Sequence, residues 1–389
     1  MEKPWASDGA SPIVERTGTM FTIEVFILAA IFGLTYGFLL QKADFCFVAS
    51  VRDFVSVKDS RIGKGILVLM STALIGWGLS LTLGVASVDQ LWAVPIGFQN
   101  LLGGLLFGIG MTIAGSCASG ALYRSGMGYV QFWIVIAAMI TGNLLFAYIY
   151  DPWGSNYLIE PLTMAEGYSM YEIGLPFMVL PLILVGLLLL VTIRKFGWSG
   201  FWQGVKNSLT DWQGNPFTQQ HWDVRFVALL MGVVATIQFV TMSSISVTGP
   251  ETRLGGVFMA SMFGEQMVYN NVYLNNMFAA YPTIGIGPEE LLVICIVVGA
   301  FISSVLSKSF KFRLPKAKRL PGAIGGGLLM GVASRIAPGC NIANVIAGVG
   351  GLSIASFIVI IGMALGVFLV TKYYFKMPIM LFYREKDAA

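Results

Sequence analysis

Charged residues are scarce in this chain. Only 11% of its 389 residues are Asp, Glu, Lys or Arg, whereas 56% are hydrophobic and the mean hydropathy is +0.76. So little polar surface excludes a water-soluble globule, because a soluble protein needs charged side chains over its surface. The net charge of +4 is modest, so nucleic-acid binding is not expected. The lipid bilayer is therefore the expected partner of most of the surface.

Histidine and cysteine are nearly as scarce. The single histidine, His221, and the four cysteines show no spacing typical of metal ligands, and no carboxylate pair stands in a catalytic arrangement. We therefore expect no metal, no cofactor and no enzyme active site, with a soft ion such as Cu(I) on the thiols as a minor alternative. Four cysteines are also too few for a disulfide scaffold, so free thiols are expected.

Long apolar runs predict about nine transmembrane helices. The runs 174–193 and 353–371 carry no charge, and each is long enough to cross a hydrocarbon core of about 30 Å. The other predicted spans lie near 21–41, 65–85, 98–116, 129–150, 226–247, 290–307 and 322–336. We therefore predict an all-α polytopic membrane protein, in which 1–389 is a single integral membrane transport domain.

Lysine and arginine are unevenly distributed among the predicted loops. They gather on one side of the nine-span arrangement, at 52–64, 194–225, 308–319 and after 371, while acidic residues dominate the other side. Because basic loops remain in the cytoplasm, this asymmetry predicts an outer N-terminus and a cytoplasmic C-terminus. The expected location is the bacterial inner membrane.

Two glycine-rich segments, 103–117 (GGLLFGIGMTIAGSC) and 326–340 (GGLLMGVASRIAPGC), align without a gap. Eight of the fifteen positions are identical, including the final Cys117 and Cys340. The two segments cross the membrane in opposite directions in the nine-span arrangement, so we predict two pseudo-symmetric, inverted halves, a recurrent transporter design. The predicted parts are the tail 1–20, the first half 21–195, the cytoplasmic interfacial linker 196–224, the second half 225–375 and the cytoplasmic tail 376–389.

Both glycine-rich segments end among residues that interrupt a helix. The small and polar residues around the two cysteines are Gly115, Ser116 and Ser119 in the first segment and Pro338, Gly339, Asn341 and Asn344 in the second. Proline lacks a backbone N–H donor, and glycine readily adopts non-helical backbone conformations. Both spans are therefore expected to break at these residues. Broken backbone inside a membrane is tolerated where it lines a wet cavity, so matching breaks indicate a transport site.

A second half-helix is expected to begin after each cysteine. Its free N–H groups and dipole attract an anion and favour a thiolate, so Cys117 and Cys340 are predicted to lie at an anion site. Close helix packing explains the glycines, but it does not explain why a cysteine occupies the same position in both segments. The expected helix caps are Ser116 or Ser119 in the first segment and Asn341 or Asn344 in the second.

Cys46, Lys42 and Arg335 also lie near the predicted breaks. Cys46 follows the first span in a polar stretch that suits the mouth of a pathway. Lys42 and Arg335 are placed either to attract an anion or to extend to the membrane interface, and long basic side chains more often do the latter. Cys295 lies in a uniform apolar run without a repeat counterpart, so a packed, inert thiol is expected there.

Three sequence motifs follow one another along the chain. Their residues are Gly37, Phe38, Gln41, Phe45, Cys46, Arg52 and Asp53; then Gly103, Gly104, Gly108, Ala114, Gly115, Cys117, Gly120, Tyr123 and Arg124; and lastly Gly326, Gly327, Gly331, Arg335, Gly339 and Cys340. In this order they resemble the YeeE/YedE family of sulfur-transport membrane proteins. The likeness covers nearly the whole chain.

The resemblance implies a transporter for thiosulfate or a related small sulfur-containing anion. In that picture Cys46, Cys117 and Cys340 form a relay of S–H donors along a central path. A small cytosolic sulfur-carrier protein of the TusA kind is the implied partner. Two alternatives stay open at this point: transport of a selenium compound, and a membrane-bound thiol enzyme, a sulfurtransferase that forms a cysteine persulfide.

Overall fold

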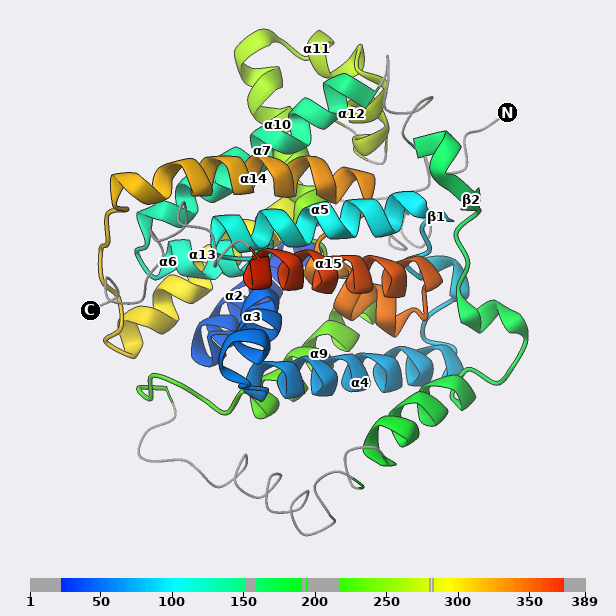
Figure 1. Ribbon diagram of the computed structural model, residues 1–389. Helices are drawn as coiled ribbons and strands as arrows, with labels where there is room; N and C mark the ends of the chain where they lie inside the picture. The colour runs from blue at the N-terminus through cyan, green and yellow to red at the C-terminus, as the bar shows by residue number, and fades with distance from the viewer. Residues whose placement is uncertain are drawn as a thin grey trace.

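The computed structural model describes residues 22–150, 159–190, 194, 217–279, 281 and 283–373. Nearly all regular structure in these residues is helical (Figure 1), which confirms the predicted all-α class. In this part of the chain the sheet consists of β1 (Ile96–Gly97) paired antiparallel with β2 (Thr163–Ala165). The predicted tails 1–20 and 376–389 lie outside the described residues, and so does most of the predicted linker 196–224.

Nine of the described helices coincide with the nine predicted spans. They are α2 (Ile23–Ala43), α4 (Arg61–Thr82), α5 (Phe98–Ala114), α7 (Val130–Ile149), the helix Val179–Leu190, α9 (Val224–Thr241), α13 (Pro288–Leu306), α14 (Leu320–Ile336) and α15 (Ile354–Tyr373). In the described residues, seven candidate spans are long and apolar enough to cross a membrane. The other two helices are shorter, and α14 has 17 residues.

Short helices continue the chain after four of the long ones. They are α3 (Phe47–Val57) after α2, α6 (Ala118–Gly126) after α5, α10 (Thr248–Phe263) after α9, and the helical stretch 341–350 after α14, which contains the π-helix η6 (Ala343–Gly348). A left-handed residue marks three of these breaks, with φ of 47° at Asp44, 79° at Gly115 and 93° at Gly339. The predicted breaks beside Cys117 and Cys340 are therefore confirmed.

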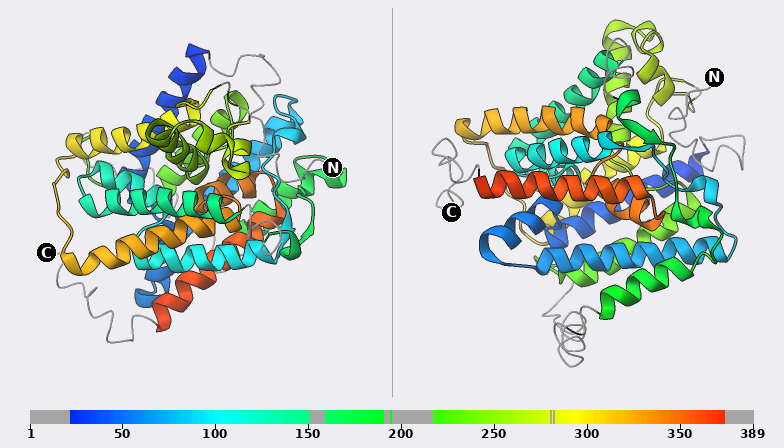
Figure 2. Two further views of the ribbon diagram at one scale, coloured as in Figure 1. Left: turned by 90° about the horizontal axis from the view of Figure 1, so that it is seen from above. Right: turned by 45° about the vertical axis from the view of Figure 1, so that its right-hand side comes forward.

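The remaining short elements lie along the connections between the longer helices. They are the 3-10 helices η1 (Val88–Gln90), η3 (Glu160–Leu162), η4 (Met170–Ile173) and η5 (Ala317–Arg319), and the helices α11 (Gln266–Tyr269) and α12 (Val272–Met277). Together with α10, the last two project from one side of the bundle, as Figures 1 and 2 show.

The helices pack in matched pairs across the two halves. α5 packs on α15 and α14 packs on α7, while α2 packs on α13 and α4 on α9. The glycines at these contacts match too: a Cβ at Gly108 would lie 2.2 Å from the carbonyl oxygen of Met363, and one at Gly331 would lie 2.3 Å from that of Met139. Only glycine permits such close approach of two helix backbones.

α5 and α14 lie side by side and run in opposite directions (Figure 1). A Cβ on Gly103, early in α5, would lie 2.3 Å from the backbone nitrogen of Ala337, just after α14. Reciprocally, a Cβ on Gly326 would lie 2.5 Å from the nitrogen of Ala114 at the end of α5. The start of each helix therefore lies against the end of the other, which requires the two helices to be antiparallel. The described helices thus form the inverted repeat that the sequence predicts.

Candidate functional site

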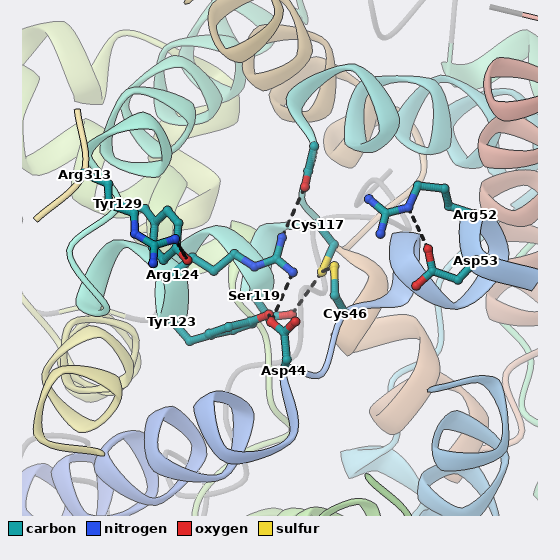
Figure 3. A network of polar contacts seen from close by, with 11 residues as sticks. Asp44, Cys46, Arg52, Asp53, Cys117, Ser119, Tyr123, Arg124, Tyr129 and Arg313 are labelled. Atoms are coloured by element: carbon teal, nitrogen blue, oxygen red, sulfur yellow. Dashed lines mark hydrogen bonds and ion pairs between the residues drawn. The ribbon is translucent and has the colours of Figure 1, made fainter. Parts of the chain in front are cut away.

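Two of the predicted site cysteines are in contact. Cys46 Sγ and Cys117 Sγ lie 3.6 Å apart, at the breaks after α2 and α5 (Figure 3). Both thiols are free and buried, and they are the N-cap residues of α3 and α6. Each sulfur therefore sits at the N-terminus of a short helix, where unpaired N–H groups and the helix dipole favour negative charge.

Gly120 has no side chain, and this absence makes room for the sulfurs of Cys46 and Cys117. A Cβ at this position would lie 2.4 Å from Ser116 Oγ, 3.1 Å from Cys117 Sγ and 3.3 Å from Cys46 Sγ. Ser119 Oγ lies 3.6 Å from Cys117 Sγ, and the buried hydroxyl of Ser116 has no hydrogen-bond partner in the part of the chain that the structure describes. A buried hydroxyl without a partner beside two thiols is available to a ligand.

The predicted caps of α6 are wrong. Cys117 itself is the N-cap residue, and its side chain makes no capping hydrogen bond to the first turn. Ser119 instead lies inside that turn, beside the Cys117 thiol. The amides of the first turn are therefore left without a side-chain acceptor next to the two thiols.

Cys340 occupies the corresponding position in the second half. It is fully buried and directly precedes the helical stretch 341–350. Backbone amides of Val247 and Thr248, at the start of α10, face its sulfur, and so do amides of its own helix. Two helix N-termini therefore meet at Cys340, as two others meet at Cys46 and Cys117.

Asn341 and Asn344 do not cap the helix after Cys340, so this prediction is also wrong. The side-chain nitrogen of Asn344 donates to the carbonyl oxygens of Pro338 (3.3 Å) and Cys340 (3.0 Å). Among the described residues, the buried Oδ1 atoms of both asparagines have no hydrogen-bond partner. Gly339 forms the turn before this helix in the left-handed region, at φ 93°. The amides at this helix start face the Cys340 sulfur rather than an asparagine side chain.

Lys42 is an anchor for the chain that leads into α9. It is fully buried, and its ammonium donates to the carbonyl oxygens of Phe217 (2.8 Å) and Gln219 (2.7 Å). The Trp222 amide donates in turn to the Lys42 carbonyl oxygen at 2.8 Å. Lys42 is thus held by backbone carbonyl groups of the predicted linker, and its extension to the membrane interface stays a prediction.

Arg335 is also buried, with 8% of its surface exposed. Its guanidinium donates to three neutral acceptors: Thr248 Oγ1 at 2.8 Å, Ser334 Oγ at 3.2 Å and the Tyr273 hydroxyl at 3.4 Å. Because the Thr248 amide faces Cys340, Arg335 holds a positive charge beside the Cys340 site.

Sequence reasoning did not select Asp44, Tyr123 and Arg124 as site residues. Arg124 donates to Asp44 Oδ1 and to the Gly115 carbonyl oxygen, both at 3.2 Å, and the Tyr123 hydroxyl also donates to Asp44 (Figure 3). Arg124 thus ties the break after α2 to the break after α5. Tyr123 and Arg124 belong to the second motif and lie in the helix that follows Cys117, and Asp44 is a charged residue two positions before Cys46, but nothing in the sequence pairs them.

Broken helices in two inverted halves, with buried thiols at the helix N-termini, define a membrane transport protein. The chain belongs to the sulphur-transport family, whose family model matches residues 42–369. The resemblance to the YeeE/YedE proteins is thereby confirmed.

Three relatives illustrate the match. The thiosulfate transporter TsuA of Escherichia coli (strain K12) is 26% identical over 336 residues, which cover 82% of this chain and 86% of that protein. TsuA of Spirochaeta thermophila is 26% identical over 352 residues, 86% of this chain and 94% of that one. The probable transporter YedE of Escherichia coli is 35% identical over 124 residues, which cover 32% of this chain and 30% of that protein. The names of these relatives confirm the expectation of a transporter rather than an enzyme.

Proposed function

We propose that this protein carries thiosulfate, or a closely related small sulfur-containing anion, into the bacterial cytoplasm. The observation that carries the proposal is the contact between Cys46 and Cys117 at two helix N-termini, matched by Cys340 at two others. The two relatives that cover most of the chain are both named thiosulfate transporters.

The chemistry of the three cysteines suits a divalent anion that has to be released again. Thiols are weak hydrogen-bond donors, and backbone amides at helix starts attract negative charge without a full cation. Weak, successive contacts let an ion enter a path and leave it, whereas one strong site would trap it. We therefore propose that the anion passes from Cys340 to the Cys46 and Cys117 pair.

The sulfurs of Cys46 and Cys117 touch in the described conformation. An anion cannot pass between two atoms in contact, so the path is closed at this point and opens when the thiols separate. Arg124 holds both breaks and thereby positions the two sulfurs. The thiol pair is therefore proposed as the narrowest part of the path.

We also propose the arrangement in the membrane. The N-terminus lies outside, the C-terminus lies in the cytoplasm, and the halves 21–195 and 225–375 form one transport domain in the inner membrane. The unequal distribution of lysine and arginine supports this orientation. A cytosolic sulfur carrier of the TusA kind, implied by the resemblance, would receive the anion on the basic side.

Uptake of labelled thiosulfate into proteoliposomes tests the proposal. The intact protein should take up the label, and Cys46→Ala, Cys117→Ala and Cys340→Ala should each lower uptake by about tenfold or more, the effect of losing one hydrogen bond to a charged group. Cys295→Ala is the matched control. That thiol is half-buried in the contact between α13 and α2, beside Gly33, and is not part of the proposed path. Uptake no faster than in protein-free liposomes would overturn the proposal, and selenite competing as well as unlabelled thiosulfate would favour the selenium alternative.

A further inference from the structure

Glu251 is a buried carboxylic acid that the proposed path does not use. It lies in the first turn of α10 and is only 1% exposed. Among the described residues, neither of its carboxyl oxygens has a hydrogen-bond partner. An ionised carboxylate in this position would lose its hydration and gain no hydrogen bond in return. The described surroundings therefore fit the neutral, protonated acid.

Arg335 is the charged residue whose field acts on Glu251. The two do not form an ion pair: the ion pairs between described residues do not include Arg335, whose donors contact neutral oxygens instead. A buried guanidinium without a carboxylate partner carries an uncompensated positive charge. A neutral Glu251 leaves that charge available to an anion.

On α10 itself, Arg253 pairs with both Glu289 and Glu290 of α13. The other titratable groups on the helices packed against α10 also have other neighbours or are exposed. They are Tyr281 beside Glu290, Tyr273 of α12 against Arg335, Tyr148 of α7 against Met259, the half-buried Cys295 of α13 beside Gly33, and the exposed Glu265 and Tyr269 at α11. Arg335 is thus the group that responds to a change of charge on Glu251.

Glu251 and Arg335 converge on the Cys340 site. Thr248 accepts a hydrogen bond from Arg335 at 2.8 Å, and its own amide faces the Cys340 sulfur. Glu251 follows Thr248 by three residues in the same helix, which places both on one face, a single turn apart. A charge on Glu251 or Arg335 therefore acts through the electric field on an anion bound at Cys340.

We propose that Glu251 takes up a proton together with each anion, so that transport is coupled to proton entry; this rests on the proposed function. When Glu251 is ionised, its carboxylate pairs with Arg335 and repels an incoming anion. A proton bound from outside neutralises Glu251, frees Arg335, and allows the anion to bind at Cys340. Both leave toward the cytoplasm, so one proton enters with each anion and no covalent bond changes.

The test measures accumulation in proteoliposomes at zero membrane potential, with the outside either at the inner pH or more acidic. One coupled proton should raise the final ratio of inner to outer thiosulfate by about tenfold for each pH unit of gradient. In Glu251→Gln the final inner and outer thiosulfate concentrations should be equal at every pH gradient, because glutamine cannot bind and release a proton. Glu265→Gln, at an exposed position beside α11, is the matched control and should behave as the wild type.

A second measurement does not depend on the variant. Adding thiosulfate to wild-type proteoliposomes should acidify the interior, as reported by an enclosed pH-sensitive dye. Labelled uptake without acidification, or gradient-driven accumulation in Glu251→Gln, would overturn the coupling while leaving thiosulfate transport intact. Wild-type protein that takes up no thiosulfate would instead overturn the proposed function.

Discussion

At the scale of single residues, the space around the two thiols depends on Gly120. This residue lies in the first turn of α6, and a side chain there would point at Ser116 Oγ and at both sulfurs. A methyl group at 2.4 Å from an oxygen must displace it, and the sulfurs at 3.1 and 3.3 Å leave little room to yield. The site is therefore sensitive to a single added carbon atom.

Gly120→Ala is expected to lower thiosulfate uptake by about tenfold, since overpacking strain is on the order of 1–3 kcal/mol. Gly325→Ala is the matched control, because nothing lies within 4 Å of a Cβ at that position in α14. Both variants are compared in the liposome uptake assay at equal amounts of folded protein. Equal uptake by the two variants would contradict the placement of the thiols.

At the scale of helices, Arg124 of α6 joins the two breaks that hold the thiols. Its guanidinium donates in two directions, to Asp44 at the end of α2 and to the Gly115 carbonyl oxygen at the end of α5. Lysine has the same charge but lacks the planar fork, so it cannot reproduce both hydrogen bonds. Arg124 is therefore a positioning residue for Cys46 and Cys117.

Arg124→Lys is expected to have two effects. The rate of oxidative cross-linking between Cys46 and Cys117 should fall several-fold, and thiosulfate uptake should fall by a similar factor. The cross-link is followed by mass spectrometry after mild oxidation of the purified protein. Arg61→Lys serves as the control, because Arg61 is 84% exposed and bonds only to nearby Asp59. A normal cross-linking rate in Arg124→Lys would show that the guanidinium does not position the thiols.

The helix pairs of the two halves should respond alike to added volume. Gly108→Ala pushes α5 from α15, and Gly331→Ala pushes α14 from α7, with nearly equal approaches of 2.2 and 2.3 Å to a carbonyl oxygen. We expect both variants to lower the free energy of unfolding by about 1–3 kcal/mol. The thermal midpoint in detergent measures this, with Gly325→Ala as the unaffected control. A large effect at one glycine alone would argue against equivalent packing.

At the scale of the whole molecule, the predicted orientation assigns each loop to one side of the membrane. Lys311, between α13 and α14, should lie in the cytoplasm, and Ser87, after α4, should lie outside; both are exposed. A membrane-impermeant thiol reagent applied to intact cells should therefore label Ser87→Cys and spare Lys311→Cys. In inverted membrane vesicles the pattern should reverse. Labelling of Lys311→Cys from outside would reverse the proposed direction of the chain.

Residue patterns along the chain predicted the helices and the repeat well. Apolar runs located nine helices, and the shared glycines and cysteines predicted the inverted pair α5 and α14. The caps at Ser116, Ser119, Asn341 and Asn344 failed because they were assigned from the general preference of serine and asparagine for N-cap positions, which does not fix the residue at which the helix begins. In the fold, Cys117 occupies the cap position of α6, Ser119 contacts the Cys117 thiol, and Asn344 donates to the carbonyl oxygens of Pro338 and Cys340.

Hydropathy, helix breaks and loop charge are properties of neighbouring residues, so the sequence by itself determined the class of protein, the spans, the repeat and the family. Contacts between distant segments depend on how the helices pack. Only the tertiary structure decided that Cys46 touches Cys117, 71 positions away, and that Arg124 clamps their two breaks. It also decided that Glu251 lies near Arg335 without a hydrogen-bond partner among the described residues. The charge and length of a side chain do not reveal which residues will surround it after folding.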